Sequence, residues 1–212
     1  MDAATRTGKR AYLRPHDRRR QLLDAASRLF DRGGLTAITM VAVASEAGAS
    51  RRLVYDHFDD LASLYEAFFE DRVARYVAAV DSGIRSGDGD TLASVLGAFG
   101  QLLAVPADDL RAIRLVIADT GIHELDRARL RLRSHLEERW LPAMEQPDID
   151  RDLAAAVLWS VMDGLVGLAA RAANGEIPAD TATALAGALV ARLPAAVAET
   201  QRSINQQRGA LR

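Results

Sequence analysis

Residues 46–58, EAGASRRLVYDHF, concentrate side chains that bind phosphate groups and base edges. Arg51, Arg52, Tyr55 and His57 follow Ser50 closely, and few side chains between them are of the kind that a core buries. A guanidinium can donate two parallel hydrogen bonds to a phosphate or to guanine. Tyrosine and histidine can donate single hydrogen bonds. The stretch is therefore a candidate nucleic-acid contact, and a solvated corner of a helical protein is the alternative.

Patterns for catalysis or metal binding are weaker. The chain has no cysteine, which excludes thiolate ligands and disulfides. Asp119 and His123 have the i, i+4 spacing of a helical metal pair, but Gly121 between them is expected to end the helix. The sequence HELD at 123–126 lacks the second histidine of zinc hydrolases. We expect no enzyme activity, no metal and no cofactor.

Charge is distributed unevenly along the 212 residues, 49% of which are hydrophobic. Residues 1–58 hold 11 basic and 6 acidic side chains, whereas the remainder holds 16 basic and 23 acidic ones. A basic head on an acidic body suggests that the head meets a polyanion. The basic N-terminus carries no apolar stretch of signal-peptide length, and no uninterrupted apolar run is long enough for a membrane span. We expect a soluble cytoplasmic protein that binds no membrane.

Apolar side chains recur at helical spacing nearly throughout, and nothing alternates like a strand, so the expected fold class is all-α. Glycine and proline mark the breaks between helices, and the tail after Glu199 is expected to fray. The expected helices are a first one ending at Gly33–Gly34, 39–47, 50–56, a long one from Asp59 or Asp60, 91–104, 107–119, one from Leu125 interrupted or kinked at Pro142, 150–173, and one from Ala179 to Leu193 or, kinked at Pro194, to Glu199.

The two short helices 39–47 and 50–56 form a predicted helix–turn–helix, in which the second helix enters the major groove of DNA. Thr39 and Ser50 can cap them, and Gly48 can adopt the left-handed conformation of the turn. We place a DNA-binding domain at 1–60, with a flexible basic tail at 1–16. A larger helical domain for ligand binding and dimerisation follows at 61–212.

The segment from Arg18 to Phe68 resembles the N-terminal domain of the TetR family of bacterial transcriptional regulators. The shared order is an arginine-rich start, three helix signatures and a leucine in the fourth helix. The matching residues are Ala25, Ala26, Leu29, Phe30, Gly33, Thr39, Val43, Ala44, Ala47, Gly48, Ser50, Tyr55, His57, Phe58 and Leu64. The resemblance implies a homodimer paired through its last two helices, with Tyr55 and His57 bonded to phosphates.

Two positions depart from the family pattern. Leu61 occupies the place where many members carry a phosphate-binding lysine at the start of the fourth helix. Arg52 and Leu53 occupy places where many members carry glycine and a small residue in the third helix. Phosphate anchoring is therefore expected to shift to Arg51, Arg52 and the tail arginines, and no operator sequence can be taken from a relative.

The DNA-contact candidates have alternative roles. Arg51 and Arg52 can read bases or bind phosphate without specificity, Tyr55 can cap a core edge, and His57 can pack under Phe58. Thr39 and Ser50 serve first as caps, and the tail arginines, Arg10 and Arg14 among them, can be simply solvated. The predicted DNA-binding residues are Arg18, Arg19, Arg20, Thr39, Ser50, Arg51, Arg52, Leu53, Tyr55 and His57.

The larger domain supplies candidates for a pocket and a dimer interface, and plain core packing is the alternative for both sets. The predicted pocket residues are Phe99, Leu103, Ile113, Ile117, His123, Trp140, Met144, Trp159 and Met162. The predicted interface residues are Leu158, Val161, Leu165, Leu168, Leu185 and Leu189.

The expected function is that of a ligand-responsive repressor of transcription, a homodimer released from a palindromic operator in double-stranded DNA by a small molecule. The alternative is a helical small-molecule binding protein or enzyme that does not use its DNA-binding head. The sequence identifies neither the effector nor the operator.

Overall fold

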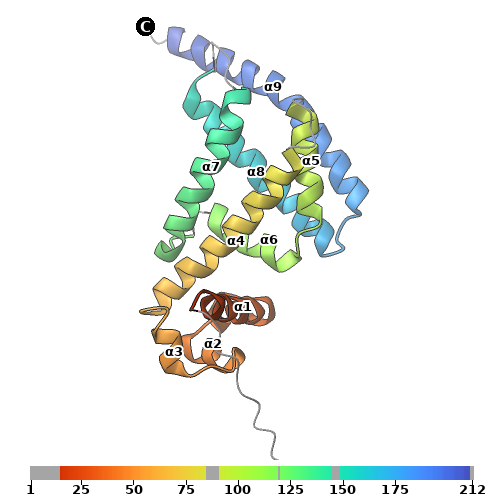
Figure 1. Ribbon diagram of the computed structural model, residues 1–212. Helices are drawn as coiled ribbons and strands as arrows, with labels where there is room; N and C mark the ends of the chain where they lie inside the picture. The colour runs from red at the N-terminus through yellow and green to blue at the C-terminus, as the bar shows by residue number, and fades with distance from the viewer. Residues whose placement is uncertain (1–14, 85–90, 119, 145–148, 211–212) are drawn as a thin grey trace, which may run out of the picture. The chain divides into compact units, whose positions relative to one another are not determined.

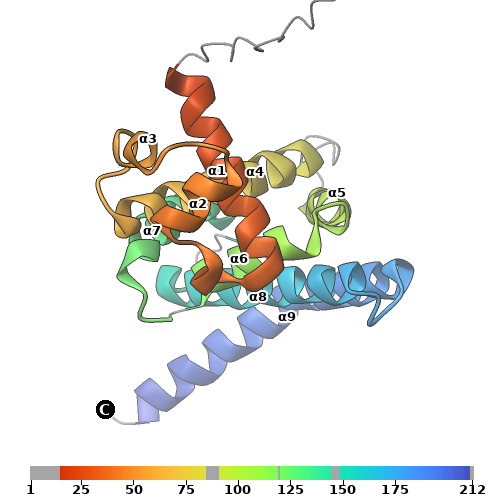
Figure 2. The same ribbon diagram turned by 90° about the horizontal axis from the view of Figure 1, so that it is seen from below.

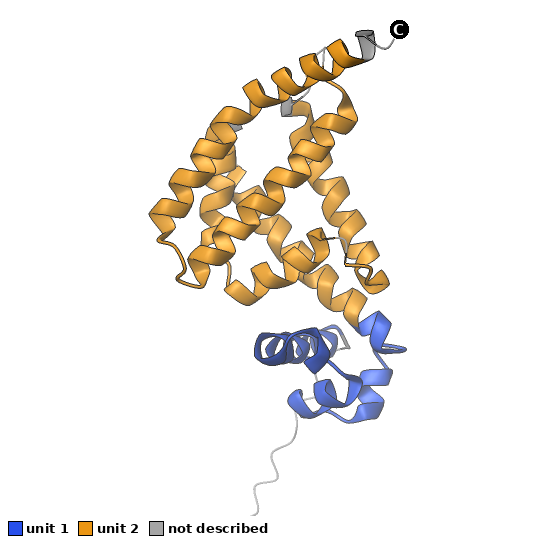
Figure 3. Ribbon diagram, turned by 180° about the vertical axis from the view of Figure 1, so that it is seen from behind, with its two compact units in different colours: residues 1–64 blue, residues 65–212 orange. Residues whose placement is uncertain are grey.

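The structure, a computed structural model, describes residues 15–84, 91–118, 120–144 and 149–210. The regular elements of these residues are all helical, which confirms the predicted fold class. The chain divides into two compact units, the first ending at Leu64 and the second beginning at Tyr65 (Figure 3). Helix α4 contains this boundary, so the backbone passes from one unit to the other within a helix.

The helices are labelled in Figure 1. In chain order, the elements are α1 (Pro15–Gly33), the 3₁₀ turn η1 (Leu35–Ala37), α2 (Met40–Glu46), α3 (Arg51–Tyr55), α4 (Leu61–Ile84), α5 (Thr91–Leu103), α6 (Ala107–Ile117), the 3₁₀ turn η2 (His123–Leu125), α7 (Asp126–Met144), α8 (Arg151–Ala173) and α9 (Ala179–Ala210).

The first unit is built on the apolar face of α1. Leu22, Ala26 and Phe30 recur at helical spacing and are buried, and α1 packs against α2. Val54 of α3, which is fully buried, completes this core. The 19 residues of α1 thus hold in place two helices that are too short to be stable alone.

Polar contacts join α1 to the end of α2. The Glu46 carboxylate accepts hydrogen bonds from Arg28 Nε, at 2.7 Å, and from Arg32. Gln21 Nε2 donates to the carbonyl of Ala47 at 3.0 Å. The hydrogen bonds from Arg32 and then Arg28 lower the pKa of Glu46 below its ordinary value. The charged form of Glu46 is therefore the one that the folded unit favours.

Replacing Glu46 with glutamine is expected to lower the Tm at pH 7 by no more than roughly 4 °C, because exposed ion pairs contribute little. The pKa of Glu46 is lower in the folded state than its ordinary value of 4.5, so its contribution is present above 4.5 and disappears as the pH falls through the lowered value. Thermal melts from pH 8 to pH 2 should show the two proteins converging in acid. Glu138→Gln, at an exposed glutamate of α7, should not change the pH profile.

The second unit is arranged around α8. Helices α5, α6, α7 and α9 all contact α8, as Figures 1 and 2 show. Its buried residues Leu158, Met162 and Val166 lie one turn apart. Arg129 of α7 donates to the carbonyls of Val116 and Ala118, both at 3.0 Å, and so satisfies acceptors at the end of α6.

Helices α4 and α5 approach each other closely at Gly83. A Cβ atom at this position would lie 2.3 Å from the carbonyl oxygen of Gly97 and 2.4 Å from the backbone of Ala98. No side chain fits at such distances, because both neighbours are backbone atoms. Glycine at position 83 therefore fixes where the two helices meet.

Three boundaries differ from the sequence-based expectation. The tail after Glu199 is helical to Ala210, because Val197 and Gln201 are buried and Gln201 Oε1 accepts the backbone N–H of Asp150 at 3.1 Å. Residues 15 and 16, expected in the flexible tail, belong to α1, where proline suits the first turn. The η1 turn was not predicted.

Helices α8 and α9 are long and apolar enough, by length and composition, to cross a membrane. Asp163 in α8 and Arg192 in α9 interrupt the apolar sequence of these helices. Within the apolar windows of these helices, 44% and 22% of the residues, respectively, are buried inside the chain. Packing in the second unit accounts for part of the apolar character of α8, whereas most of the α9 window remains uncovered.

Candidate nucleic-acid interface

The turn between α2 and α3 has a specific hydrogen-bond pattern. Gly48 has a φ of +60°, a backbone conformation that residues with a side chain rarely adopt. The N–H of Ala49 bonds to the carbonyl of Ala44 at 2.9 Å, and the N–H of Gly48 bonds to that of Ser45 at 3.1 Å. These two bonds form a Schellman motif, which ends α2 and redirects the chain within two residues.

Both short helices begin with a hydroxyl cap. Thr39 Oγ1 accepts the N–H of Ala42 at 3.1 Å, and Ser50 Oγ accepts that of Leu53 at 3.2 Å. The predicted caps are therefore present. Each hydroxyl keeps its own hydrogen, which remains able to bond to a phosphate oxygen.

Helix α3 has one buried and one exposed side. Val54 is fully buried, whereas Arg51, Arg52 and Tyr55 are exposed, with 54% of Tyr55 accessible. Leu53 and His57 are half-buried. The helix thus presents two guanidinium groups in its first turn and a phenol one turn later, which is the arrangement needed to reach base edges and flanking phosphates.

The arginines at the start of α1 differ in their surroundings. Arg18 Nη1 donates to Gln21 at 2.7 Å, and the guanidinium of Arg19 lies 5.1 Å from the centre of the Phe58 ring. Arg20 is exposed. Arg10 and Arg14 lie outside the described residues. Val41 of α2, which was not among the predicted contact residues, is an exposed apolar side chain.

Helix α4 begins with a reciprocal cap. Asp60 Oδ1 accepts the N–H of Ser63 at 2.8 Å, and Ser63 Oγ accepts the N–H of Asp60 at 3.2 Å. Asp60 is therefore the start of the helix, one of the two alternatives expected from the sequence. Leu61, at the family's lysine position, is half-buried.

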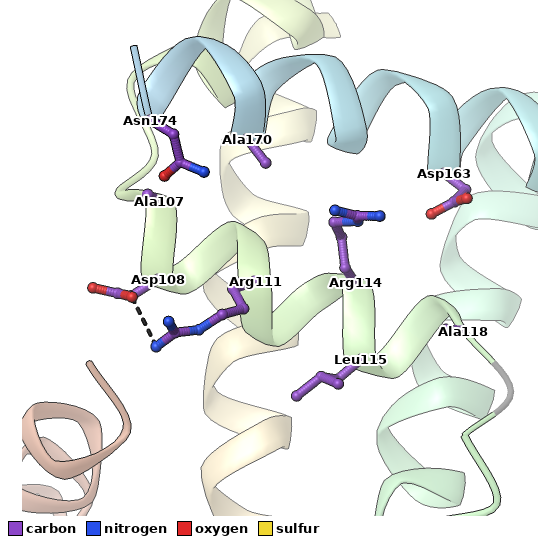
Figure 4. A pocket seen from close by; sticks show the side chains of 9 residues that line it. All are labelled: Ala107, Asp108, Arg111, Arg114, Leu115, Ala118, Asp163, Ala170 and Asn174. Carbon is purple, nitrogen blue, oxygen red and sulfur yellow. Dashed lines mark ion pairs between the residues drawn. The ribbon is translucent and has the colours of Figure 1, made fainter. Parts of the chain in front are cut away.

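Two hollows among the described residues of the second unit are of small-molecule size. One, of about 250 Å³, lies between α4, α5 and α6 and is lined by Ile113 among the predicted pocket residues. The other is an open cleft of about 450 Å³ between α6 and α8 (Figure 4). There Arg114 extends from α6 toward α8, which carries Asp163, while Arg111 pairs with Asp108 at 2.8 Å.

The other predicted pocket residues lie in different surroundings. Phe99, Trp140 and Met162 are buried, and Leu103, Ile117 and Trp159 are half-buried. His123 is at the surface, with 94% of its side chain exposed. It lies on η2, which turns the chain between α6 and α7. The side chain of Met144 is outside the described part of the chain.

The predicted interface residues fall into two groups. Leu158, Val161 and Leu165 are buried within the single chain, with 3% of Leu165 exposed, which favours the alternative of core packing for these three. Leu168 is half-buried. Leu185 and Leu189 of α9 are 48% and 40% exposed and lie on the uncovered side of the helix pair. A surface groove beside them is lined by Ala156, Val157, Ser160, Val161, Leu189 and Leu193.

A metal site has no support among the residues described, which contain no cluster of three histidine, aspartate or glutamate side chains suited to an ion. Asp119, half of the suspected metal pair, lies outside the described residues. His123 instead lies 3.5 Å from Asp126, through its Nδ1 atom.

Comparison with known proteins agrees with this geometry. Residues 22–68 match the family described as bacterial regulatory proteins, tetR family. The chain is 30% identical over 179 residues to the HTH-type transcriptional repressor Rv1474c of Mycobacterium tuberculosis, covering 79% of this chain and 89% of that one.

Solved structures share the fold. A TetR-like transcriptional regulator from Rhodococcus sp. RHA1 superposes with a TM-score of 0.67 at 21% identity, over 86% of this chain and 98% of that chain. A tetR-family transcriptional regulator from Streptomyces coelicolor gives 0.66 at 22% identity, over 92% of this chain and 86% of that one. With a helix–turn–helix that exposes two arginines and a relative at 30% identity over most of its length, the chain belongs to the tetR family of bacterial regulatory proteins and is a DNA-binding transcriptional regulator.

Proposed function

We propose that the protein is a repressor that binds a palindromic operator as a homodimer and is released by a small molecule. The observation that carries the proposal is the exposed side of α3, on which Arg51, Arg52 and Tyr55 surround a single buried anchor, Val54. A helix fixed in this way places its first turn in the major groove. Residues 1–60 are the proposed DNA-binding domain, and residues 61–212 bind the effector and the second copy.

Base reading is assigned to the two arginines of α3. Each guanidinium can bond to O6 and N7 of one guanine, which discriminates by about 1–3 kcal/mol. Tyr55, His57, Ser50 and Thr39 supply phosphate contacts, together with Arg20 from α1. Arg18 and Arg19 are already held by Gln21 and Phe58, and therefore position the end of α1 more than they bind DNA.

The proposed dimer forms through the uncovered side of α8 and α9. Leu185 and Leu189 are exposed there beside an apolar groove, and most residues of the apolar window of α9 are not buried by the chain itself. A two-fold axis would place the same surface of both copies in contact and cover these leucines. Such a dimer presents two copies of α3 to two half-sites one DNA turn apart, roughly 34–36 Å.

Regulation follows from a difference in affinity. A small molecule can bind more tightly to a form of the dimer in which the two α3 helices have a different separation. It then lowers the population of the DNA-binding form, by no more than the ratio of its affinities for the two forms. We assign the protein to the cytoplasm, where the DNA and effector are accessible. The second candidate function, a helical binding protein or enzyme without DNA binding, is separated from the first by operator binding itself.

The affinity for the operator is expected to fall steeply with salt. The three guanidinium groups of Arg20, Arg51 and Arg52 bring about six positive charges of the dimer against the DNA polyanion, which predicts a slope of log K against log salt of roughly −5. Fluorescence anisotropy with the duplex upstream of the protein's own gene, from 50 to 300 mM KCl, measures the slope. A slope near zero, or equal affinity for a scrambled duplex, would favour the second candidate function.

A further inference from the structure

The cavity between α4, α5 and α6 has a polar inner end. One face of α4 contributes Arg72, Arg75, Tyr76 and Ala79, which follow the i, i+3, i+4, i+7 spacing of neighbouring turns. Arg72 and Tyr76 are 3% and 2% exposed, respectively. The volume of about 250 Å³ corresponds to roughly eight water molecules at about 30 Å³ each, which is room for a small organic compound.

The buried cation in this cavity is bound by a carboxylate from another helix. Arg72 forms an ion pair with Asp109, which lies in the first turn of α6. The Arg72 guanidinium also lies 5.0 Å from the centre of the Phe68 ring. Arg75 approaches the same carboxylate, with 3.7 Å between its Nη1 and Asp109 Oδ2, and pairs with Asp71 at 2.7 Å. One carboxylate of α6 is therefore shared by two guanidinium groups of α4.

Tyr76 is a second unusual feature. Its hydroxyl is buried and has no hydrogen-bond partner among the described residues. A buried hydroxyl without a hydrogen-bond partner lowers the stability of the fold, so we expect this hydroxyl to hydrogen-bond to a ligand. Burial raises the pKa of the Tyr76 phenol above its ordinary value, which keeps the hydroxyl protonated and able to donate.

The remaining lining determines what else a ligand must carry. Ala79, Ala104, Val105, Pro106 and Ile113 form an apolar wall, and Gln101 lies at the surface. Arg75 is already paired with Asp71, so the groups at the inner end that can receive an anion are the Arg72 guanidinium and the Tyr76 hydroxyl, both of them hydrogen-bond donors. We infer that this cavity is the effector site and binds a small organic acid, whose carboxylate takes the place of Asp109 on Arg72 and accepts the hydroxyl of Tyr76, while its apolar body lies against α5 and α6.

The effect of acid binding on DNA binding rests on the proposed function, whereas the binding of the acid itself does not. An acid that competes with Asp109 breaks the link between α4 and α6. Helix α4 also carries the chain into the first unit, so the ligand acts on the element that joins the two units. A charged ligand at this position can thus alter DNA binding without touching the DNA-binding residues.

Isothermal titration calorimetry on the full chain tests the site without DNA. Benzoate and hexanoate are the probes, with benzamide, hexanamide and benzylamine as comparisons of similar size and different charge. At least one acid is expected to bind, and its amide at least tenfold more weakly. Tyr76→Phe should weaken acid binding by roughly ten- to a hundredfold, as expected for a hydrogen bond to a charged group, and should leave folding intact because it removes an unpartnered hydroxyl.

Tyr65→Phe is the matched control, because Tyr65 is on the same helix and outside the cavity lining. Binding by neither acid at 10 mM, equal binding of acids and amides, tighter binding of benzylamine, or equal effects of the two tyrosine variants would overturn the site. Because the titration contains no DNA, its result is independent of operator binding. If the acid binds as expected but does not release the operator in the anisotropy assay, the cavity is not the effector site.

Discussion

The double variant Arg51→Ala, Arg52→Ala is expected to lose about a thousandfold of its preference for operator over scrambled DNA. A dimer presents four such guanidinium groups, and at about 1 kcal/mol for each bidentate base contact the total is about 4 kcal/mol. Both side chains are exposed on a helix that Val54 and the Ser50 cap hold in place, so the fold should be unaffected. Anisotropy with the two duplexes at one salt concentration measures the ratio.

The alternative role of these arginines gives a different result. If they bind only phosphate, both affinities fall together and the ratio is unchanged, which assigns base reading to other residues. The matched control is Arg131→Ala, Arg139→Ala, which removes the same charge from exposed positions of α7. It should affect neither the ratio nor the affinity beyond a small change in overall charge.

Leu189→Arg is expected to convert the dimer to monomers and to weaken binding to a two-half-site operator by roughly 10²- to 10⁴-fold. The loss follows because the second half-site is no longer bound at a high effective concentration. Leu189 is 40% exposed in the single chain, so an arginine can remain hydrated there in a monomer, whereas in the proposed interface it would be buried without a partner. Sedimentation velocity reports the oligomeric state.

Leu130→Arg is the control for this variant, because Leu130 is 65% exposed on α7 and outside the proposed interface. It should remain dimeric and bind the operator normally. If the Leu189→Arg protein remains a dimer, the dimer interface does not lie on the uncovered side of α8 and α9. Leu165 is unsuitable for the test, since it is 3% exposed within one chain and an arginine there would destabilise the fold itself.

The helical elements could be predicted because their signals are local. The caps Thr39 and Ser50, the left-handed Gly48 and the apolar face of α1 depend on residues a few positions apart, and each is present as expected. The residues that determine where α9 ends are not close together in the sequence. Gln201 is held by the backbone of Asp150, which is 51 positions earlier, and no spacing rule indicates that contact.

The pocket and the interface were harder to predict for a related reason. In an apolar helix such as α8, composition does not reveal which side faces the same chain and which faces outward. Leu165 and Leu189 therefore looked equivalent in the sequence, although one is buried and the other exposed. Arg72 and Tyr76 were not chosen because their significance depends on Asp109, from a distant helix. The signal available in the sequence was that two arginines and a tyrosine, Arg72, Arg75 and Tyr76, share one face of a long helix.

The close approach at Gly83 gives α4 the geometry of a lever. Helix α4 cannot slide past α5 there without a clash, so rotation about this point is its easier movement. Arg72 is 11 residues from Gly83 and Leu61 is 22, or about 16 and 33 Å along a rigid helix at 1.5 Å per residue. A sideways displacement at Arg72 is therefore doubled at Leu61. Because a side chain at position 83 would clash with the backbone of α5, it would force the two helices apart and displace this pivot point.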